Sequence, residues 1–393
     1  MKTAPRLLFI LAALLLAGPS ASAETQRVTD DGSLRRALRD LEAGDVVEIA
    51  PGRYRGGLVL RAVSGTEKNR IVIRGSDKDD PPEFRGGGIE GWHLVDCNYV
   101  TLANMTVRGF RGNGINADDG GSYDTPSTGI VLEDLAVLET GPRGNHDGIK
   151  LSGLVDFTVR RCRIESWGGS AIDMVGCHRG VIEDCHVEGK PGHTNHSGVQ
   201  LKGGTSEVLV QMSFFKGVTH RSVNLGGSTG LRYFRPKAEG YEATKIVVAG
   251  NRFVGSQAPV AFVTARGGAF RYNTIYRPDK WVFRILQEQP TPKFDPCQRG
   301  VFEHNLVVTR RGFRINIGPN TKPDTFTFKN NLWHDGHGNR PRLPAKEAGG
   351  LYNVDLFLKN AGAPEMRPSA EDEALKTVGA HAWERKELEE VAW

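Results

Sequence analysis

The polar residues best suited to chemistry recur at one place in four short, similar segments. These read G-I-K-L at 148–151, A-I-D-M at 171–174, G-V-Q-L at 198–201 and S-V-N-L at 222–225. In each segment two apolar residues flank one polar residue, which is the alternation of a β-strand with one buried face. Stacked in register, the segments place four polar residues side by side on an exposed surface: Lys150, Asp173, Gln200 and Asn224.

The same alternation predicts further polar residues on both sides of this row. One column holds His146, His196 and His220, and Lys202 follows the third segment. Parallel strands lie about 4.8 Å apart, so four rungs span roughly 15 Å, the size of a few sugar residues. By the same alternation Asp147 falls at an inward or turn position, and we interpret it first as a turn residue.

This combination of residues suits the removal of a proton beside a carboxylate, which is the chemistry of β-elimination in a uronate. The reaction needs a group that neutralises the carboxylate, a base, and an acid for the leaving oxygen. Gln200 and Asn224 supply amides, and Lys150 and Lys202 supply a cation or a base. The three histidines supply further proton carriers. We therefore predict five catalytic candidates: Lys202, His196, Lys150, His146 and His220.

Two irregular insertions, at 118–128 and 226–241, are predicted to stand beside this surface. The second contains Arg232-Tyr233-Phe234-Arg235. Aromatic faces suit sugar rings, and arginine binds carboxylates through two parallel hydrogen bonds. The predicted substrate-binding residues are Asp173, Gln200, Asn224, Arg221, Arg232, Tyr233 and Arg235.

The spacing of the segments indicates the architecture that positions them. Successive segments are 23, 27 and 24 residues apart, and each of the first three is followed by a second strand-like run. Such a period without helical patterning is typical of a β-solenoid. The sequence predicts an all-β fold, a parallel β-helix over 24–340, with a capping helix near 33–43 that has Ser33 as its N-cap, and an irregular C-terminal cap at 341–393.

Two columns of the second strand are interpreted as structural. Asn251, Asn273, Asn305 and Asn331 are predicted to form a ladder of amides along one turn of the solenoid. Cysteines at equivalent positions in earlier coils are interpreted as small buried residues, with a disulfide as the alternative.

Residues 1–23 have the pattern of a secretory signal peptide. Two basic residues precede a ten-residue apolar run, and an A-S-A site ends at Ala23. We expect export to the periplasm or the exterior, no membrane insertion, and a monomer. The net charge of +5, of which Lys2 and Arg6 would leave with the signal, weakly favours an acidic partner, here a polysaccharide and not a nucleic acid.

The order of signal peptide, capping helix, G-D-V-V-E-I-A-P-G-R-Y and strand pairs closely resembles right-handed parallel β-helix proteins of the pectate lyase superfamily. Within it, the chain looks most like the alginate lyase and chondroitinase B type. The resemblance implies a secreted, carbohydrate-active protein and places Lys202, in V-Q-L-K-G-G, at the position of the base lysine. It also implies Ca²⁺, but His196 and Gln200 stand near the positions of its acidic ligands. An arginine that the resemblance implies one coil later falls at Gly226.

Three functions remain open at this point. We predict a polysaccharide lyase that cleaves a uronate-containing polysaccharide. An inverting glycoside hydrolase would need two carboxylates on the same face, for which Asp173 and Asp118 are the candidates. A glycan-binding protein without catalysis would need no cluster of lysine and histidine.

Overall fold

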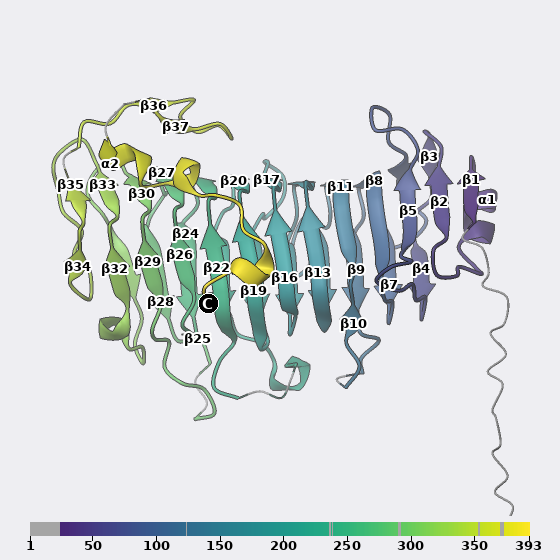
Figure 1. Cartoon of the computed structure of the whole chain (residues 1–393), viewed down its shortest axis with the longest axis horizontal. Coiled ribbons are helices and arrows are strands. Elements are labelled where there is room, and N and C mark those ends of the chain that lie inside the picture. The colour runs from purple at the N-terminus through teal and green to yellow at the C-terminus, as the bar shows by residue number, and fades with distance from the viewer. Residues whose placement is uncertain are drawn as a thin grey trace, which may run out of the picture.

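The computed structural model describes residues 24–393 except 123, 236, 238, 290–291, 353 and 370–372, so the predicted signal peptide lies outside the described residues. The chain winds into a long solenoid of parallel strands with α1 (Asp31–Ala37) at its N-terminal end (Figure 1). A ten-stranded parallel sheet follows the whole solenoid. Its strands are β4 (Leu58–Arg61), β7 (Trp92–Val95), β9 (Ile115–Asp118), β12 (Ile149–Ser152), β15 (Ser170–Val175), β18 (Ser197–Lys202), β21 (Arg221–Gly226), β24 (Ala258–Val263), β28 (Phe283–Leu286) and β31 (Ile315–Ile317).

A 25-stranded sheet forms the rest of the coil walls. Its early strands are β1 (Thr25–Val28), β2 (Val46–Ile49), β3 (Arg53–Tyr54), β5 (Ile71–Gly75), β6 (Glu83–Phe84), β8 (Val100–Arg108), β10 (Ser127–Thr128), β11 (Val131–Leu138), β13 (Leu154–Arg160), β14 (Arg163–Glu165), β16 (His178–Glu183), β17 (His186–Glu188) and β19 (Thr205–Gln211). Its later strands are β20 (Phe214–Lys216), β22 (Ala243–Ala249), β23 (Arg252–Val254), β25 (Ala265–Arg266), β26 (Ala269–Arg271), β27 (Thr274–Tyr276), β29 (Val301–Glu303), β30 (Leu306–Val308), β32 (Thr327–Lys329), β33 (Leu332–His334), β34 (Glu347–Ala348) and β35 (Leu351–Tyr352).

The predicted register of the four polar segments is confirmed. Lys150 pairs with Asp173, Asp173 with Gln200, and Gln200 with Asn224. The apolar residues on either side of this row point inward and are fully buried, as at Ile172. The parallel β-helix therefore follows directly from stacking the repeated alternation, because only this register buries every apolar column at once.

Each coil contributes two faces to the 25-stranded sheet, and the chain turns sharply between them. One residue in each coil takes a positive φ there, as at Asn104, Asp134 and Arg161, with φ of 51°, 54° and 52°. The next residue in each coil faces the interior. In the later coils that residue is asparagine, and the predicted ladder is confirmed: each amide nitrogen donates to the oxygen of the next, from Asn251 to Asn273 at 3.1 Å and onward to Asn331.

Buried small residues occupy the same column in the earlier coils. Cys162 and Cys185 are both free thiols in the interior, so the structural interpretation of these cysteines is confirmed.

The capping helix is present but shorter than predicted and starts earlier. Its N-cap is Asp30, whose carboxylate accepts a hydrogen bond from the Ser33 amide at 2.8 Å, while the Ser33 hydroxyl accepts one from the Asp30 amide. Ser33 is therefore the reciprocal partner in a capping box and not the N-cap. Leu34 and Ala37 bury their side chains in the core, so the helix packs against the first coil.

The C-terminal prediction needs two corrections. Strand pairing continues to Tyr352, past the expected boundary at 340, because β34 and β35 add one more coil. The segment beyond it includes β36 (Leu358–Lys359), β37 (Arg367–Pro368) and α2 (Glu373–Lys376), and then runs back along the solenoid to its middle instead of only covering the last coil (Figure 1). Arg385 forms ion pairs with Glu183 and Asp184, which holds this segment against the 25-stranded sheet.

Candidate active site

The ten-stranded sheet presents a second row of polar residues that strict alternation does not predict. Gly148 and Gly198 point inward, because a Cβ at either would meet core atoms, among them Ile164 and Phe215. The chain therefore bends at this point in each coil, and the residue three positions before the polar row faces the same surface as that row. Asp147 is such a residue: it precedes β12 and is fully buried, and its carboxylate is turned toward Lys150 of the polar row.

Asp147 and Asp173 form a buried ionic network with two lysines. Lys150 binds both carboxylates, Asp147 at 3.4 Å and Asp173 at hydrogen-bond distance. Lys202 Nζ lies 2.8 Å from the other oxygen of Asp173. Both aspartate side chains have no exposed surface, whereas the side chains of Lys150 and Lys202 are 22% and 16% exposed. The carboxylates thus hold two ammonium groups in place from beneath.

The charges of this network set the protonation of its members. Burial raises the pKa of Asp147 to about 6, and the negative charge of Asp173 adds to the rise, against the effects of Lys150 and the Ser170 amide. Burial also acts to raise the pKa of Asp173, but Lys202 and Lys150 outweigh it and the pKa is lowered. Burial acts to lower the pKa of Lys150, but both carboxylates outweigh it and raise the pKa, so Lys150 is a fixed cation.

Replacing Asp147 by asparagine is expected to change how stability depends on pH. Because the folded pKa lies above the ordinary value of 3.8, the wild-type protein loses stability from this group as pH rises from about 4 to about 6. The asparagine side chain would mimic the protonated acid and would not titrate. The Asp147→Asn variant should therefore gain on the order of 2–3 kcal/mol relative to wild type over this window, measured by urea unfolding at several pH values. A difference in unfolding free energy that is constant with pH would contradict the assignment.

A pocket of about 600 Å³ opens above the two lysines. Lys150, Lys202, Ser152 and Val175 form its floor. Its walls come mainly from the two insertions that the sequence predicted beside this surface, which contribute Asp118, Asp119, Gly121, Ser228, Thr229, Gly230, Tyr233 and Arg235. Asn116 of β9 and Asn145 before β12 complete the lining. This pocket is the candidate active site.

The second insertion is held in place by the buried carboxylate of Glu242. That carboxylate accepts hydrogen bonds from the Thr229 amide at 2.6 Å, the Gly203 amide at 2.7 Å and the Gln289 amide group at 2.6 Å. Tyr233 ends a short 3₁₀ turn and is 46% exposed, and its hydroxyl accepts a hydrogen bond from Arg232 at 2.5 Å. Arg235 forms an ion pair with the buried carboxylate of Asp119, which closes one wall of the pocket.

The predicted histidines precede strands β12, β18 and β21, whereas most of the pocket lies over the C-terminal ends of the strands and the loops that follow them. His196 and His220 stack with ring centroids 4.1 Å apart. Partial burial, the neighbouring His220 and Arg221 lower the pKa of His196 to about 4, so its imidazole is neutral near pH 7. His146 is exposed. The residues that line the pocket include no histidine, so the predicted patch divides into a lysine pocket and a separate histidine stack.

The remaining predicted substrate-binding residues are only partly available to a substrate, because other residues of the fold already bind their side chains. Asn224 is 2% exposed and donates to the Gly226 carbonyl oxygen, so its amide is already used within the fold. Arg221 forms an ion pair with Glu288 at 2.5 Å. Gln200 is half-buried and lies 3.3 Å from the Ser170 hydroxyl, between the lysine pocket and the histidine stack.

Asp118, which the sequence analysis named as a candidate carboxylate for hydrolysis, lines the pocket and pairs with His93, an imidazole outside the pocket lining that the sequence analysis did not assign. Asp118 lies 2.6 Å from His93, and this hydrogen bond raises the pKa of His93. Burial acts to raise the pKa of Asp118, but His93 and the Gly120 amide outweigh it and lower the pKa, so Asp118 is ionised. The signal was the segment I-N-A-D at 115–118, which repeats the alternation of the four polar segments one coil earlier.

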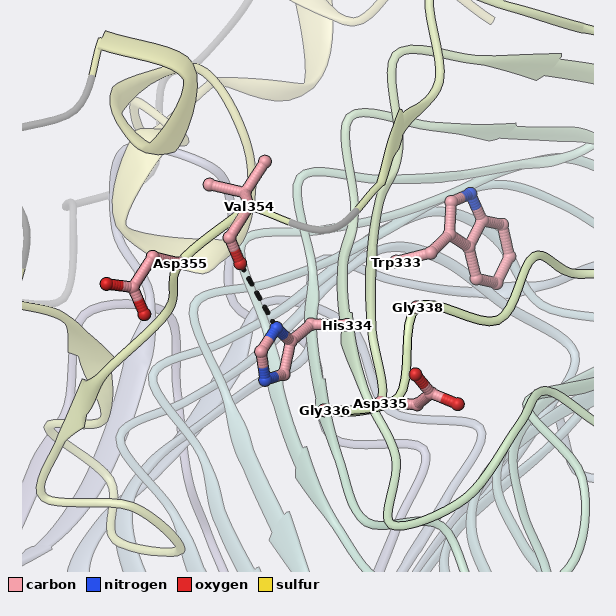
Figure 2. A pocket seen from close by; sticks show the side chains of 7 residues that line it. All are labelled: Trp333, His334, Asp335, Gly336, Gly338, Val354 and Asp355. Carbon is pink, nitrogen blue, oxygen red and sulfur yellow. Dashed lines mark hydrogen bonds between the residues drawn. The ribbon is translucent and has the colours of Figure 1, made fainter.

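A second cavity of about 430 Å³ at the C-terminal end lacks comparable chemistry. The Nδ1 atom of His334 donates a hydrogen bond to the Val354 carbonyl oxygen, and Asp335 and Asp355 point away from each other (Figure 2). Asp335 accepts hydrogen bonds from Gly312, His337 and Asn339, which lower its pKa against the effect of burial. Its carboxylate therefore organises a loop and is not free for proton transfer.

The donor set of the site does not fit the Ca²⁺ that the resemblance implies. Calcium binds six to eight oxygens, with carboxylates foremost among them. The two buried carboxylates are already bound to Lys150 and Lys202, whose ammonium groups take the place of a cation. Among the described residues no group of three or more histidine, cysteine or acidic side chains is arranged to hold a metal ion. Within the same residues no helix is long and apolar enough to cross a bilayer.

Fold and site together define a right-handed parallel β-helix protein with a lysine-lined pocket on its ten-stranded sheet. A family model described as "Right handed beta helix region" matches residues 88–234, which include the pocket floor and part of its walls. The probable endo-xylogalacturonan hydrolase A of Neosartorya fischeri is 31% identical over 115 residues. That match covers 25% of this chain and 28% of the fungal protein, so the chain spans little more than a quarter of the curated relative that it matches.

Solved structures share the fold over most of the chain. An alginate lyase from Paenibacillus sp. str. FPU-7 superposes with a TM-score of 0.51 at 17% identity, covering 80% of this chain and 99% of the lyase. The pectate lyase Pel9A superposes with a TM-score of 0.54 at 14% identity, covering 93% and 98%. The predicted parallel β-helix is confirmed by these similarities, and the named neighbours act on polysaccharides.

Proposed function

We propose that this protein is an exported enzyme that cleaves a uronate-containing polysaccharide by β-elimination in the pocket above Lys150 and Lys202. The observation that carries the proposal is the pair of ammonium groups held in the pocket floor by two buried carboxylates. Fixed cations stabilise the negative charge that develops on a uronate carboxylate when the adjacent proton leaves, and they need no reorganisation to do so. An acidic substrate is part of this proposal, because the ammonium groups would act on the carboxylate of the reacting sugar.

The two lysines are suited to different roles. Lys150 bridges Asp147 and Asp173 and is a fixed cation, so we assign it to neutralise the carboxylate of the substrate. Lys202 has a single ion-pair partner, Asp173, whereas Lys150 has two. We therefore assign Lys202 as the base that takes the proton. The hydroxyl of Tyr233, on the pocket wall, is assigned to protonate the leaving oxygen.

An inverting hydrolase is the second candidate, because the fungal relative is named as a hydrolase. That mechanism needs two accessible carboxyl groups about 6.5–9.5 Å apart. Asp118 is one accessible carboxylate of the pocket. Asp119 is 1% exposed and bound by Arg235, and Asp147 and Asp173 are 0% exposed, so a second accessible acid is not supplied by any of these three residues. The geometry therefore favours elimination over hydrolysis.

The type of reaction can be tested with a panel of uronate polymers. Elimination creates a double bond conjugated with the carboxylate, which raises the ultraviolet absorbance, whereas hydrolysis creates reducing ends without it. We expect new absorbance that grows in step with reducing ends. Reducing ends without absorbance would replace the lyase proposal by the hydrolase, and binding without either signal would make the protein a glycan-binding module.

A further inference from the structure

A strongly basic pocket lies outside the candidate active site, nearer the C-terminal end of the solenoid. Its volume is about 310 Å³, and it is formed by the turns that precede β28 and β31. These turns lie at the same edge of the ten-stranded sheet as the histidine stack. Its charged lining residues are Arg277, Lys280, Arg310, Arg311, Arg314 and Asp279.

Among the described residues, none of these five cations has an acidic partner, a feature that they share with several other surface arginines of the protein. Elsewhere on the surface, Arg161 binds Glu133 and Asp134. Across the part of the chain that the structure describes, no carboxylate lies within ion-pair distance of any cation lining the basic pocket. Like charges gathered around one concavity repel each other, so the arrangement does not stabilise the fold. It instead concentrates positive potential where a negative ligand can enter.

An aromatic ring joins this basic pocket to the row of polar residues. The ring centroid of Trp281 lies 4.2 Å from Lys280 Nζ and 4.3 Å from Arg284 Cζ. Arg284 belongs to the same row as Gln200, three coils further on, which is roughly 14 Å along the solenoid. A partly exposed indole face flanked by cations suits a sugar ring that carries negative charge. Asn224 and Ala261, which stand between Gln200 and Arg284 in this row, are buried, so the two pockets share one face of the sheet but are separated by two coils without an exposed polar residue in the row.

We propose that the basic pocket is a distal subsite that binds anionic groups of a polysaccharide chain whose cleavage site lies in the lysine pocket. This inference rests on the proposed function for the place of cleavage and adds that the substrate is charged over several successive residues. Guanidinium groups bind carboxylate and sulfate through paired hydrogen bonds, so either group satisfies the chemistry. The pocket holds the chain and takes no part in the reaction.

Binding measurements on the full mature chain test the subsite. Arg311→Gln combined with Arg314→Gln removes two of the five cations, and both side chains are exposed, so the fold should be unaffected. Lys329→Gln combined with Arg299→Gln removes two exposed cations outside the pocket and is the matched control. The probes are polygalacturonate, which carries carboxylates alone, chondroitin sulfate, which carries both groups, and neutral dextran.

We expect wild type and control to bind at least one polyanion and the pocket variant to bind it at least tenfold more weakly, with the loss diminishing at high salt. Loss with both polymers indicates a shared anion site, and loss with the sulfated polymer alone indicates sulfate; each outcome supports the subsite. Equal binding by variant and control, or no binding of either polyanion by wild type, overturns it. If binding depends on the pocket but no polymer is cleaved, the proposed reaction is wrong and the subsite stands.

Discussion

Lys202→Arg is expected to lose at least 100-fold in turnover on a uronate polymer, as much as Lys202→Met. Arginine retains the positive charge and can still bind Asp173, but it does not give up its proton at working pH and cannot serve as a base. If Lys202 acted only as a cation, Lys202→Arg would keep most of the activity and only Lys202→Met would lose it. The measurement is the initial rate of unsaturated product, with thermal unfolding of each variant to confirm the fold.

Lys216 offers a matched control for this experiment. It lies on β20 in the same coil, its side chain is 47% exposed, and it forms a surface ion pair with Glu188. Lys216→Met should leave turnover unchanged, because a surface ion pair contributes at most about 1 kcal/mol to stability and lies on another sheet. Full activity of both Lys202 variants would remove Lys202 from the mechanism.

Asp173→Leu is expected to destabilise the protein by about 3–5 kcal/mol, because it leaves the buried end of the lysine network without its shared carboxylate. Asp173 is 0% exposed and binds Lys150 and Lys202, so the ammonium groups would lose the charge that holds them. Urea unfolding at pH 7 measures the loss. Because the pKa of Asp173 is lowered in the folded protein, its ionised carboxylate contributes to stability at pH 7. This contribution to stability declines as the pH falls through the pKa of the folded protein.

A double variant separates loss of charge pairing from loss of packing. Lys202→Met added to Asp173→Leu removes one of the two stranded cations, so the double variant should be less destabilised than the sum of the single variants. Lys245→Met, which removes a surface partner of Glu207, should add its small effect independently. Strict additivity of Asp173→Leu and Lys202→Met would mean that the two side chains do not interact in solution.

The polar row was predictable because strand alternation and the repeat together fix one register. A shift by one residue would expose Ile172 and bury Lys150, so Lys150, Asp173, Gln200 and Asn224 had to align. The asparagine ladder followed from the same column argument. Lys202 was predicted in the site from its position after the third segment, and the structure places it in the pocket floor.

The tertiary structure alone decided which of the aligned residues meet. The bend at Gly148 and Gly198 turns Asp147 toward Lys150, and that bend depends on core contacts between coils rather than on local alternation. His196 directly precedes β18 and Lys202 ends it, so the two residues lie at opposite ends of one strand. The path of the second insertion, and with it the pocket wall formed by Tyr233, is set by the buried hydrogen bonds of Glu242. Sequence therefore determined the coil and its columns, because burial of apolar residues repeats locally, whereas long-range contacts between loops and side chains determined the site.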